Sequence, residues 1–122
     1  MDKKVVLVVE DNKELREVLK TILETGYGYE VLEATDGATA IGILTGRKPH
    51  IDAAILDIVM KGHGGSVRDY LKKMPQYREV PIIYHTGLSK EQFDNRILEG
   101  AYYIQKGEGS IKKIGEILKS KI

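Results

Sequence analysis

Apolar residues along this chain alternate between short β-branched runs and stripes with helical spacing, and the alternation repeats five times. The short runs are rich in Val, Ile and Leu, which is typical of strands buried on both faces of a parallel sheet. They predict strands at Lys4–Val9, Tyr29–Ala34, Ile51–Leu56, Pro81–His85 and Ala101–Gln105. Apolar residues spaced three and four apart predict amphipathic helices between these runs. The helices are expected between Asn12 and Gly26, over Asp36–Gly46, around Val67–Met74, over Ser89–Glu99 and over Gly109–Lys121.

Five strands alternating with five helices predict an α/β protein whose doubly wound parallel sheet is covered by helices on both faces. The helix predicted over Ser89–Glu99 has a thin apolar face, made by Phe93 and Ile97. No linker, internal repeat or low-complexity segment interrupts the 122 residues. A chain of this size can bury one core, so a single domain over residues 1–122 is expected.

Composition narrows the classes of function. The formal net charge is +1, from 19 basic and 18 acidic residues, which gives no reason to expect nucleic acid or an acidic membrane as a partner. The absence of cysteine excludes a disulfide scaffold, thiol catalysis and a cysteine zinc site. No apolar stretch is long enough to cross a bilayer, and acidic residues occur too early for a secretory signal. We therefore expect a cytoplasmic protein.

Polar side chains gather where the predicted strands end. Glu10 and Asp11 follow the first strand, Asp57 follows the third, Thr86 the fourth and Lys106 the fifth. Carboxyl ends of parallel strands lie along one edge of the sheet, where ligands bind in open α/β folds. Three carboxylates, a hydroxyl and an ammonium are therefore expected to converge there.

Such a cluster of charges points to a metal ion. Two unit charges about 4 Å apart repel by roughly 4 kcal/mol at an effective dielectric near 20, so three carboxylates need a cation or a proton. Mg²⁺ fits because it keeps several waters and binds one or two carboxylates together with a phosphate oxygen. Lys106 adds a fixed positive charge for a phosphoryl group. Phosphoryl transfer depends mostly on positioning and charge neutralisation, which these groups supply.

Sequence motifs at these strand ends carry a family resemblance. They are VVEDN at Val8–Asn12, LDIVM at Leu56–Met60, TG at Thr86–Gly87 and YIQK at Tyr103–Lys106, and Gly65 and Gly100–Ala101 fit as well. With these motifs in order, the chain resembles the receiver domain of two-component response regulators along its whole length. The resemblance implies a flavodoxin-like fold, a three-layer sandwich of five helices and a five-stranded parallel sheet in the order 2-1-3-4-5.

The resemblance also implies a chemistry for the strand-end residues. Asp57 would accept a phosphoryl group from a phosphohistidine on a sensor histidine kinase or phosphotransfer protein. Mg²⁺ would be held by Glu10, Asp11, Asp57 and the backbone carbonyl of Val59. The chain would then be a phosphorylation-dependent signalling switch and not an enzyme.

Three further residues take roles from the same resemblance. Thr86 would donate its hydroxyl to the phosphorylated aspartate, Lys106 would pair with the phosphoryl oxygens, and Tyr103 would be the switch aromatic. Movement of that ring would remodel the surface of helix four, strand five and helix five, through which a downstream effector protein binds. A homodimer through that face is compatible with the family, and direct contact with nucleic acid or membrane is not expected.

Departures from the family pattern occur at two positions where prolines are usual. Lys61 should leave the loop after the acceptor looser, and Gly107 should follow Lys106 through a trans peptide bond, because a cis bond before a non-proline costs about 3 kcal/mol. Val59 and Leu88 offer no carboxylate or amide to orient water, so we expect a long-lived phosphoaspartate.

The three histidines show no pattern of a metal site. His50 has no evident partner in the sequence, and His63 is expected to be exposed in a glycine-rich loop. His85 directly precedes Thr86 in a strand, and a partly buried histidine with satisfied hydrogen bonds is expected there.

Alternative functions compete with the switch. A receiver that binds partners without phosphorylation usually lacks an acceptor, acidic pair or lysine, and all are present here. A haloacid-dehalogenase-type phosphatase needs a second aspartate two positions after the nucleophile, where this chain has Val59. A flavodoxin-like nucleotide binder would want a glycine- or hydroxyl-rich loop after the first strand, where this chain has the acidic EDN.

Overall fold

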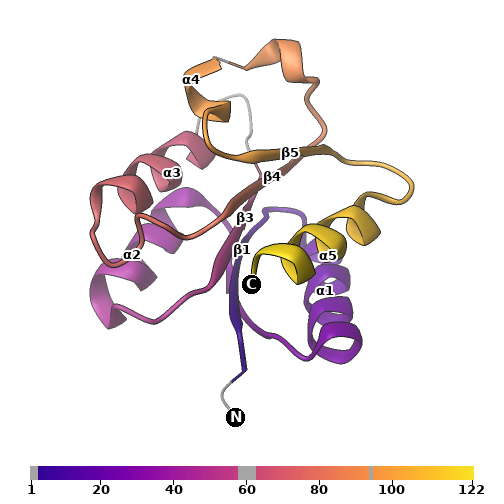
Figure 1. Cartoon of the computed structure of the whole chain (residues 1–122), viewed down its shortest axis with the longest axis horizontal. Coiled ribbons are helices and arrows are strands. Elements are labelled where there is room, and N and C mark those ends of the chain that lie inside the picture. Colours follow the sequence, from indigo (N-terminus) through magenta and orange to yellow (C-terminus); the bar gives the residue numbers. More distant parts are fainter. Residues whose placement is uncertain (1–2, 58–62, 94) are drawn as a thin grey trace.

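A five-stranded parallel sheet runs through the middle of the computed structural model, which describes residues 3–57, 63–93 and 95–122 (Figure 1). The strands are β1 (Val5–Val9), β2 (Glu30–Ala34), β3 (Ala53–Leu56), β4 (Ile82–Thr86) and β5 (Tyr102–Gln105). They pair in the order β2-β1-β3-β4-β5, and every pair is parallel. The predicted α/β class and strand order are therefore confirmed.

Helices cover both faces of this sheet. In Figure 1, α2 and α3 lie on one side of the strands, and α1 and α5 lie on the other. The helical segments are α1 (Lys13–Thr21), the π-helical turn η1 (Ile22–Gly26), α2 (Gly37–Arg47), α3 (His63–Lys73), the 3₁₀ turn η2 (Lys90–Gln92), α4 (Asn95–Leu98) and α5 (Ser110–Lys121). The start of α1 is fixed by Asn12, whose side-chain oxygen accepts the Leu15 N–H at 2.9 Å.

Two apolar layers hold the helices to the sheet. Side chains of β1 alternate between them, so Leu7 and Val9 belong to the layer under α2 and α3, while Val6 and Val8 face α1 and α5. The helices complete the layers with buried Leu44 and Leu71 on the first side and with Leu19, Leu23, Ile114 and Leu118 on the second. Each fully buried side chain of this size stabilises the fold by about 1.5–3 kcal/mol. The packing fixes the strand ends that carry the polar groups.

The prediction of one continuous helix over Ser89–Glu99 was wrong. The structure has the short η2 turn and, separately, the four-residue α4. Phe93 ends η2 with extended backbone angles, φ −106° and ψ 152°, so helical geometry is interrupted there. Gln92 closes the turn by accepting the Ser89 N–H at 2.7 Å. The thin apolar face of this segment is consistent with a weak drive to form a longer helix.

The helix α3 begins earlier than the predicted helix around Val67–Met74. His63 is the first residue of α3, so Gly65 lies in the first turn of that helix. Val59 and Lys61 lie outside the described residues. The predictions for their carbonyl and side chain are therefore left without a structural account.

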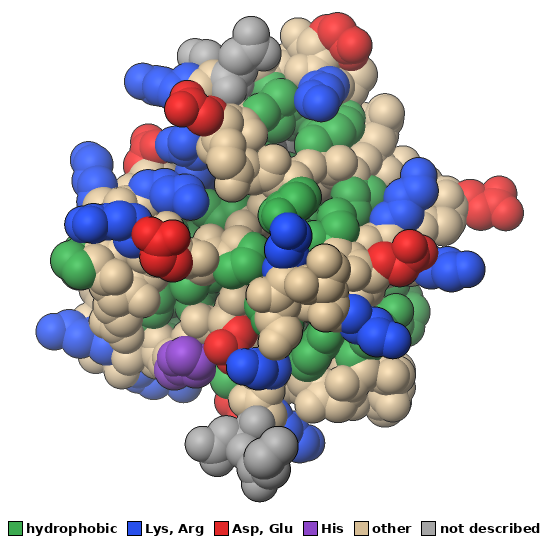
Figure 2. Space-filling view, in the orientation of Figure 1, with side chains coloured by type: hydrophobic (Ala, Val, Ile, Leu, Met, Phe, Trp, Pro, Cys, Tyr) green, Lys and Arg blue, Asp and Glu red, His purple; other side chains and the backbone are tan. Residues whose placement is uncertain are grey.

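Surface charge is mixed on the face shown in Figure 2. Basic and acidic side chains are intermingled there around hydrophobic side chains near its centre. This agrees with the net charge of +1 for the chain.

Among the helices that the structure describes, none combines the length and the apolar character required to span a bilayer.

Candidate functional site

Three carboxylates meet beyond the ends of β1 and β3. The two strands are neighbours, with Val9 opposite Leu56, and the Asp57 N–H donates to the Val9 carbonyl at 2.9 Å. Side-chain oxygens of Glu10, Asp11 and Asp57 all lie within 4.8 Å of one another. The predicted convergence of these carboxylates is therefore present in the structure.

Exposure differs between the three carboxylates. Glu10 is buried, with 2% of its surface exposed, whereas Asp11 is exposed and 9% of the Asp57 side chain is accessible. A cleft of about 110 Å³ opens beside them. It is lined by Val9, Glu10, Asp11, Thr35, Asp36, Gly37 and Asp57. The cleft leaves room beside the carboxylates for a hydrated cation, because one water occupies about 30 Å³ in the liquid.

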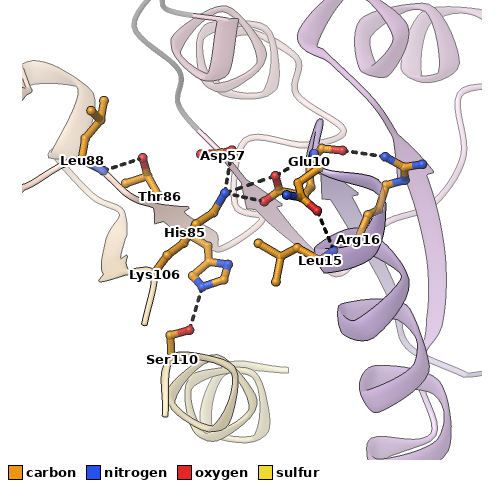
Figure 3. A network of polar contacts seen from close by, with 10 residues as sticks. Glu10, Leu15, Arg16, Asp57, His85, Thr86, Leu88, Lys106 and Ser110 are labelled. Atoms are coloured by element: carbon orange, nitrogen blue, oxygen red, sulfur yellow. Dashed lines mark hydrogen bonds and ion pairs between the residues drawn. The ribbon is translucent and has the colours of Figure 1, made fainter. Parts of the chain in front are cut away.

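Lys106, which directly follows the edge strand β5, brings a positive charge to this cluster. Its Nζ lies 2.9 Å from Asp57 Oδ2 and 2.9 Å from Glu10 Oε1 (Figure 3). Its backbone N–H donates to the Thr86 carbonyl at 2.7 Å, which places the residue at the end of β4. One ammonium thus contacts two of the three carboxylates.

Burial and hydrogen bonding set the protonation of these groups. Burial raises the pKa of Glu10 to about 7, and the charge of Asp57 adds to the rise. Hydrogen bonds from Lys106 and from the Asn12 N–H act in the opposite direction and lower the pKa. Burial disfavours the charged form of Lys106, but hydrogen bonds to Asp57 and Glu10 outweigh it and raise the pKa of the ammonium. Glu10 is therefore partly protonated near pH 7, while Lys106 stays charged.

Arg16 is a site residue that the sequence analysis missed. Its guanidinium donates to the Glu10 carbonyl at 2.9 Å (Figure 3). The same guanidinium contacts Glu33 at 3.3 Å. The Asn12 N–H donates to Glu10 Oε2 at 3.1 Å. These bonds fix the loop between β1 and α1. An arginine in a helix carries no sequence signal for a bond to the carbonyl of a preceding loop.

Thr86 and Tyr103 both hydrogen-bond to the backbone of Leu88. The Leu88 N–H donates to Thr86 Oγ1 at 3.2 Å, and the Tyr103 hydroxyl donates to the Leu88 carbonyl. Thr86 is buried, and the Tyr103 ring packs edge-on against Phe93 with centroids 5.8 Å apart. The backbone of Leu88 therefore connects the two side chains.

Two histidines have partners that were not predicted. His50 Nε2 lies 2.9 Å from Asp52 Oδ1, far from the acidic cleft. His85 is fully buried, not partly buried, and its Nε2 lies 2.9 Å from the hydroxyl of Ser110. His85 Nδ1 meets no hydrogen-bonding group among the described residues, so the expectation of a satisfied histidine was wrong. Pairings between distant elements such as these depend on packing and leave no local pattern.

The peptide bond after Lys106 is trans, as predicted, because the described residues contain no cis peptide bond. The bond leads into the exposed segment Gly107–Gly109.

The sequence profile of the response regulator receiver domain matches residues 6–114. The transcriptional regulatory protein CpxR of Escherichia coli K12 is 35% identical over 86 residues, which are 70% of this chain and 34% of that protein. The polar-differentiation response regulator DivK of Brucella ovis is 29% identical over 120 residues, covering 96% of this chain and 94% of DivK. In the first three curated relatives, the matched part is 12%, 35% and 34% of their own length.

Solved structures show the same fold. Chemotaxis protein CheY4 of Vibrio cholerae superposes with a TM-score of 0.80 at 24% identity, over 99% of this chain and all of that chain. The receiver domain of a histidine kinase from Syntrophus aciditrophicus gives a TM-score of 0.78 at 27% identity, over 95% of this chain and 88% of that one. The chain belongs to the family of response regulator receiver domains of two-component systems.

Proposed function

We propose that this chain, as one receiver domain over residues 1–122, is a signalling switch that accepts a phosphoryl group on Asp57. The observation that carries the proposal is the position of Lys106, whose ammonium lies 2.9 Å from the acceptor carboxylate and from Glu10. A cation fixed there can neutralise the charge of an incoming phosphoryl group. The alternative is a module that binds partners without phosphorylation. Such a module would not need an ammonium in contact with Asp57 and Glu10.

Asp57, Lys106 and the acidic pair each have a separate role in the proposed phosphoryl transfer. An Asp57 oxygen attacks phosphorus as the bond to the imidazole nitrogen of a phosphohistidine breaks, and the imidazole leaves with that electron pair. Lys106 pairs with the phosphoryl oxygens. Glu10 and Asp11 complete the acidic cluster with Asp57, and their hard oxygen donors suit Mg²⁺. When bound there, Mg²⁺ would neutralise charge on the carboxylates and the phosphoryl group; the Val59 carbonyl, outside the described residues, remains a proposed ligand.

Binding of Mg²⁺ is expected to depend on pH through Glu10. Its pKa is raised to about 7, so a proton occupies part of the site below that pH and must leave before the cation binds. The apparent affinity should therefore rise about tenfold from pH 6 to pH 8 in an NMR or calorimetric titration. Glu10→Gln should bind more weakly and lose most of this pH dependence. A flat profile in the unmodified protein would contradict the assignment.

The output step follows from the link between Thr86 and Tyr103. A phosphoryl group on Asp57 offers new acceptors for the Thr86 hydroxyl, and movement of that hydroxyl would break its bond from the Leu88 N–H. The Leu88 carbonyl holds Tyr103, so the ring and the α4–β5–α5 surface would respond. We propose that a downstream effector protein, or a second copy of the chain, reads this surface.

Thr86→Ala should separate phosphorylation from output. Binding of beryllofluoride with Mg²⁺, which mimics a phosphoryl group on Asp57, should shift the Tyr103 ring signals in NMR spectra. The shift should be lost in Thr86→Ala, although the variant still binds the mimic. Thr45→Ala removes an exposed hydroxyl from α2, which bonds only within that helix, and should behave like the unmodified protein. Equal Tyr103 shifts in all three proteins would refute the link.

The partner that supplies the phosphoryl group is proposed to be a sensor histidine kinase or a phosphotransfer protein. A cytoplasmic location and a long-lived phosphoaspartate remain predictions. Leu88, which lies close to Thr86, has an apolar side chain that cannot orient an attacking water.

A further inference from the structure

Lys106 stands at the start of a loop whose own turn is closed by a hydrogen bond from the Ser110 N–H to the Gly107 carbonyl at 3.1 Å. The loop Lys106–Gly109 joins β5 to α5, and its last three residues are exposed. Gly109 has a positive φ of 79°, a conformation that glycine adopts without strain. Two of the four residues are glycines, and the turn bond begins only after Lys106, so the segment itself does not determine where the Lys106 ammonium lies.

Residues at both ends of this loop form hydrogen bonds to the last two residues of β4, His85 and Thr86. At one end, the Lys106 N–H donates to the Thr86 carbonyl at 2.7 Å. At the other end, the Ser110 hydroxyl lies 2.9 Å from Nε2 of His85 (Figure 3). Consecutive residues of one fully buried strand thus bind the loop before and after its glycines.

The second of these contacts, between His85 and Ser110, places polar groups in the core at a cost in folding free energy. His85 is 1% exposed and Ser110 is 5% exposed, and Nδ1 of the histidine has no hydrogen-bonding group near it among the described residues. A buried polar atom left without a partner destabilises the folded state. An apolar side chain at position 85 would avoid that cost, and the strand carries apolar residues nearby at Ile82 and Ile83.

Serine near a helix start usually caps the helix with its side chain, but Ser110 does not cap α5. The N-cap of α5 is Gly109, which offers no side-chain cap, and Ser110 is the first helical residue. Its hydroxyl contacts the histidine instead. Burial, followed by the nearby Lys106 charge, lowers the pKa of His85 to about 4, so the ring is neutral near pH 7 and leaves the carboxylates to Lys106.

We propose that the His85–Ser110 hydrogen bond positions Lys106 at the acceptor aspartate by fixing the far end of its glycine loop. His85 and Ser110 are thus positioning residues: neither touches the phosphoryl group, and both act through the lysine. The inference rests on the proposed function for its effect on phosphoryl transfer, but not for its effect on the loop.

Ser110→Ala tests the bond, with Tyr77→Phe as the matched control. Tyr77 is also buried, and its hydroxyl donates to the Pro49 carbonyl at 2.7 Å, far from the acidic cleft. With acetyl phosphate and saturating Mg²⁺, the initial rate of labelling should fall about tenfold in Ser110→Ala, because small misplacements of a reacting group are costly. Tyr77→Phe and Ser110→Thr, which keeps the hydroxyl, should both stay within about twofold of the unmodified protein.

A second readout needs neither metal nor phosphoryl donor. Hydrogen exchange at the Lys106 amide should be faster in Ser110→Ala than in Tyr77→Phe, while amides in the middle of α5 keep their protection. Labelling at the unmodified rate, or a Lys106 amide as protected as in the control, would overturn the inference. If the unmodified protein takes up no phosphoryl group, the proposed function fails, and amide exchange alone decides whether His85 and Ser110 hold the loop.

Discussion

Replacing Lys106 with methionine is expected to lower the rate of Asp57 phosphorylation about 10²- to 10³-fold, the usual cost of removing one donor to a developing charge. The ammonium is 2.9 Å from both Asp57 and Glu10, and methionine keeps much of the side-chain length without the charge. The measurement is the initial rate of labelling by acetyl phosphate at saturating Mg²⁺.

Mg²⁺ affinity should move in the opposite direction in the same variant. Lys106 contacts two of the proposed ligands and repels a second cation, so Lys106→Met should bind Mg²⁺ on the order of tenfold more tightly. Lys112→Met removes an exposed lysine from α5 and should change neither quantity. If Lys106→Met is labelled at the unmodified rate, the role given to this lysine is wrong.

Gly115→Ala is expected to destabilise the fold by about 2 kcal/mol, although alanine is the better helix former. A Cβ at Gly115 on α5 would lie 2.0 Å from the hydroxyl oxygen of Tyr27 and 2.3 Å from its Cζ. Tyr27 cannot retreat freely because its ring stacks on Tyr29, with centroids 5.8 Å apart. Urea unfolding followed by circular dichroism gives the free energy of unfolding.

Two companion variants separate the clash from the helix preference. Gly42 on α2 is exposed, and a Cβ there would meet nothing within 4 Å, so Gly42→Ala should stabilise the fold by up to about 1 kcal/mol. In a Tyr27→Ala background, Gly115→Ala should no longer destabilise. A Gly115→Ala variant as stable as the unmodified protein would show that α5 and Tyr27 separate without cost.

The sequence was sufficient to predict the fold and the convergence of the main polar groups. Glu10, Asp57 and Lys106 could be placed together because each follows an apolar run, and parallel strands end at one edge of a sheet. That inference needs only the period of the pattern and the order of the elements. Local propensities and the fold thus agree over most of the chain.

Other features could not be predicted because they depend on contacts between distant elements. The His85–Ser110 bond joins residues 25 apart, and nothing near His85 in the sequence names its partner. The π-helical turn η1 and the extended backbone at Phe93 likewise leave no mark in the helical spacing of the apolar residues. Sequence patterns report which face of an element is buried, and not which side chain meets which across the core.

The central claim, that Asp57 accepts a phosphoryl group with the help of Mg²⁺, is tested most directly by intact mass spectrometry. The protein and its Asp57→Asn variant would each be incubated with acetyl phosphate, with Mg²⁺ and with a chelator. The account predicts the gain of one phosphoryl group in the unmodified protein with Mg²⁺ only, and no gain in the variant. Absence of that gain, under conditions that label another receiver domain, would contradict the account and favour a module that binds its partners without phosphorylation.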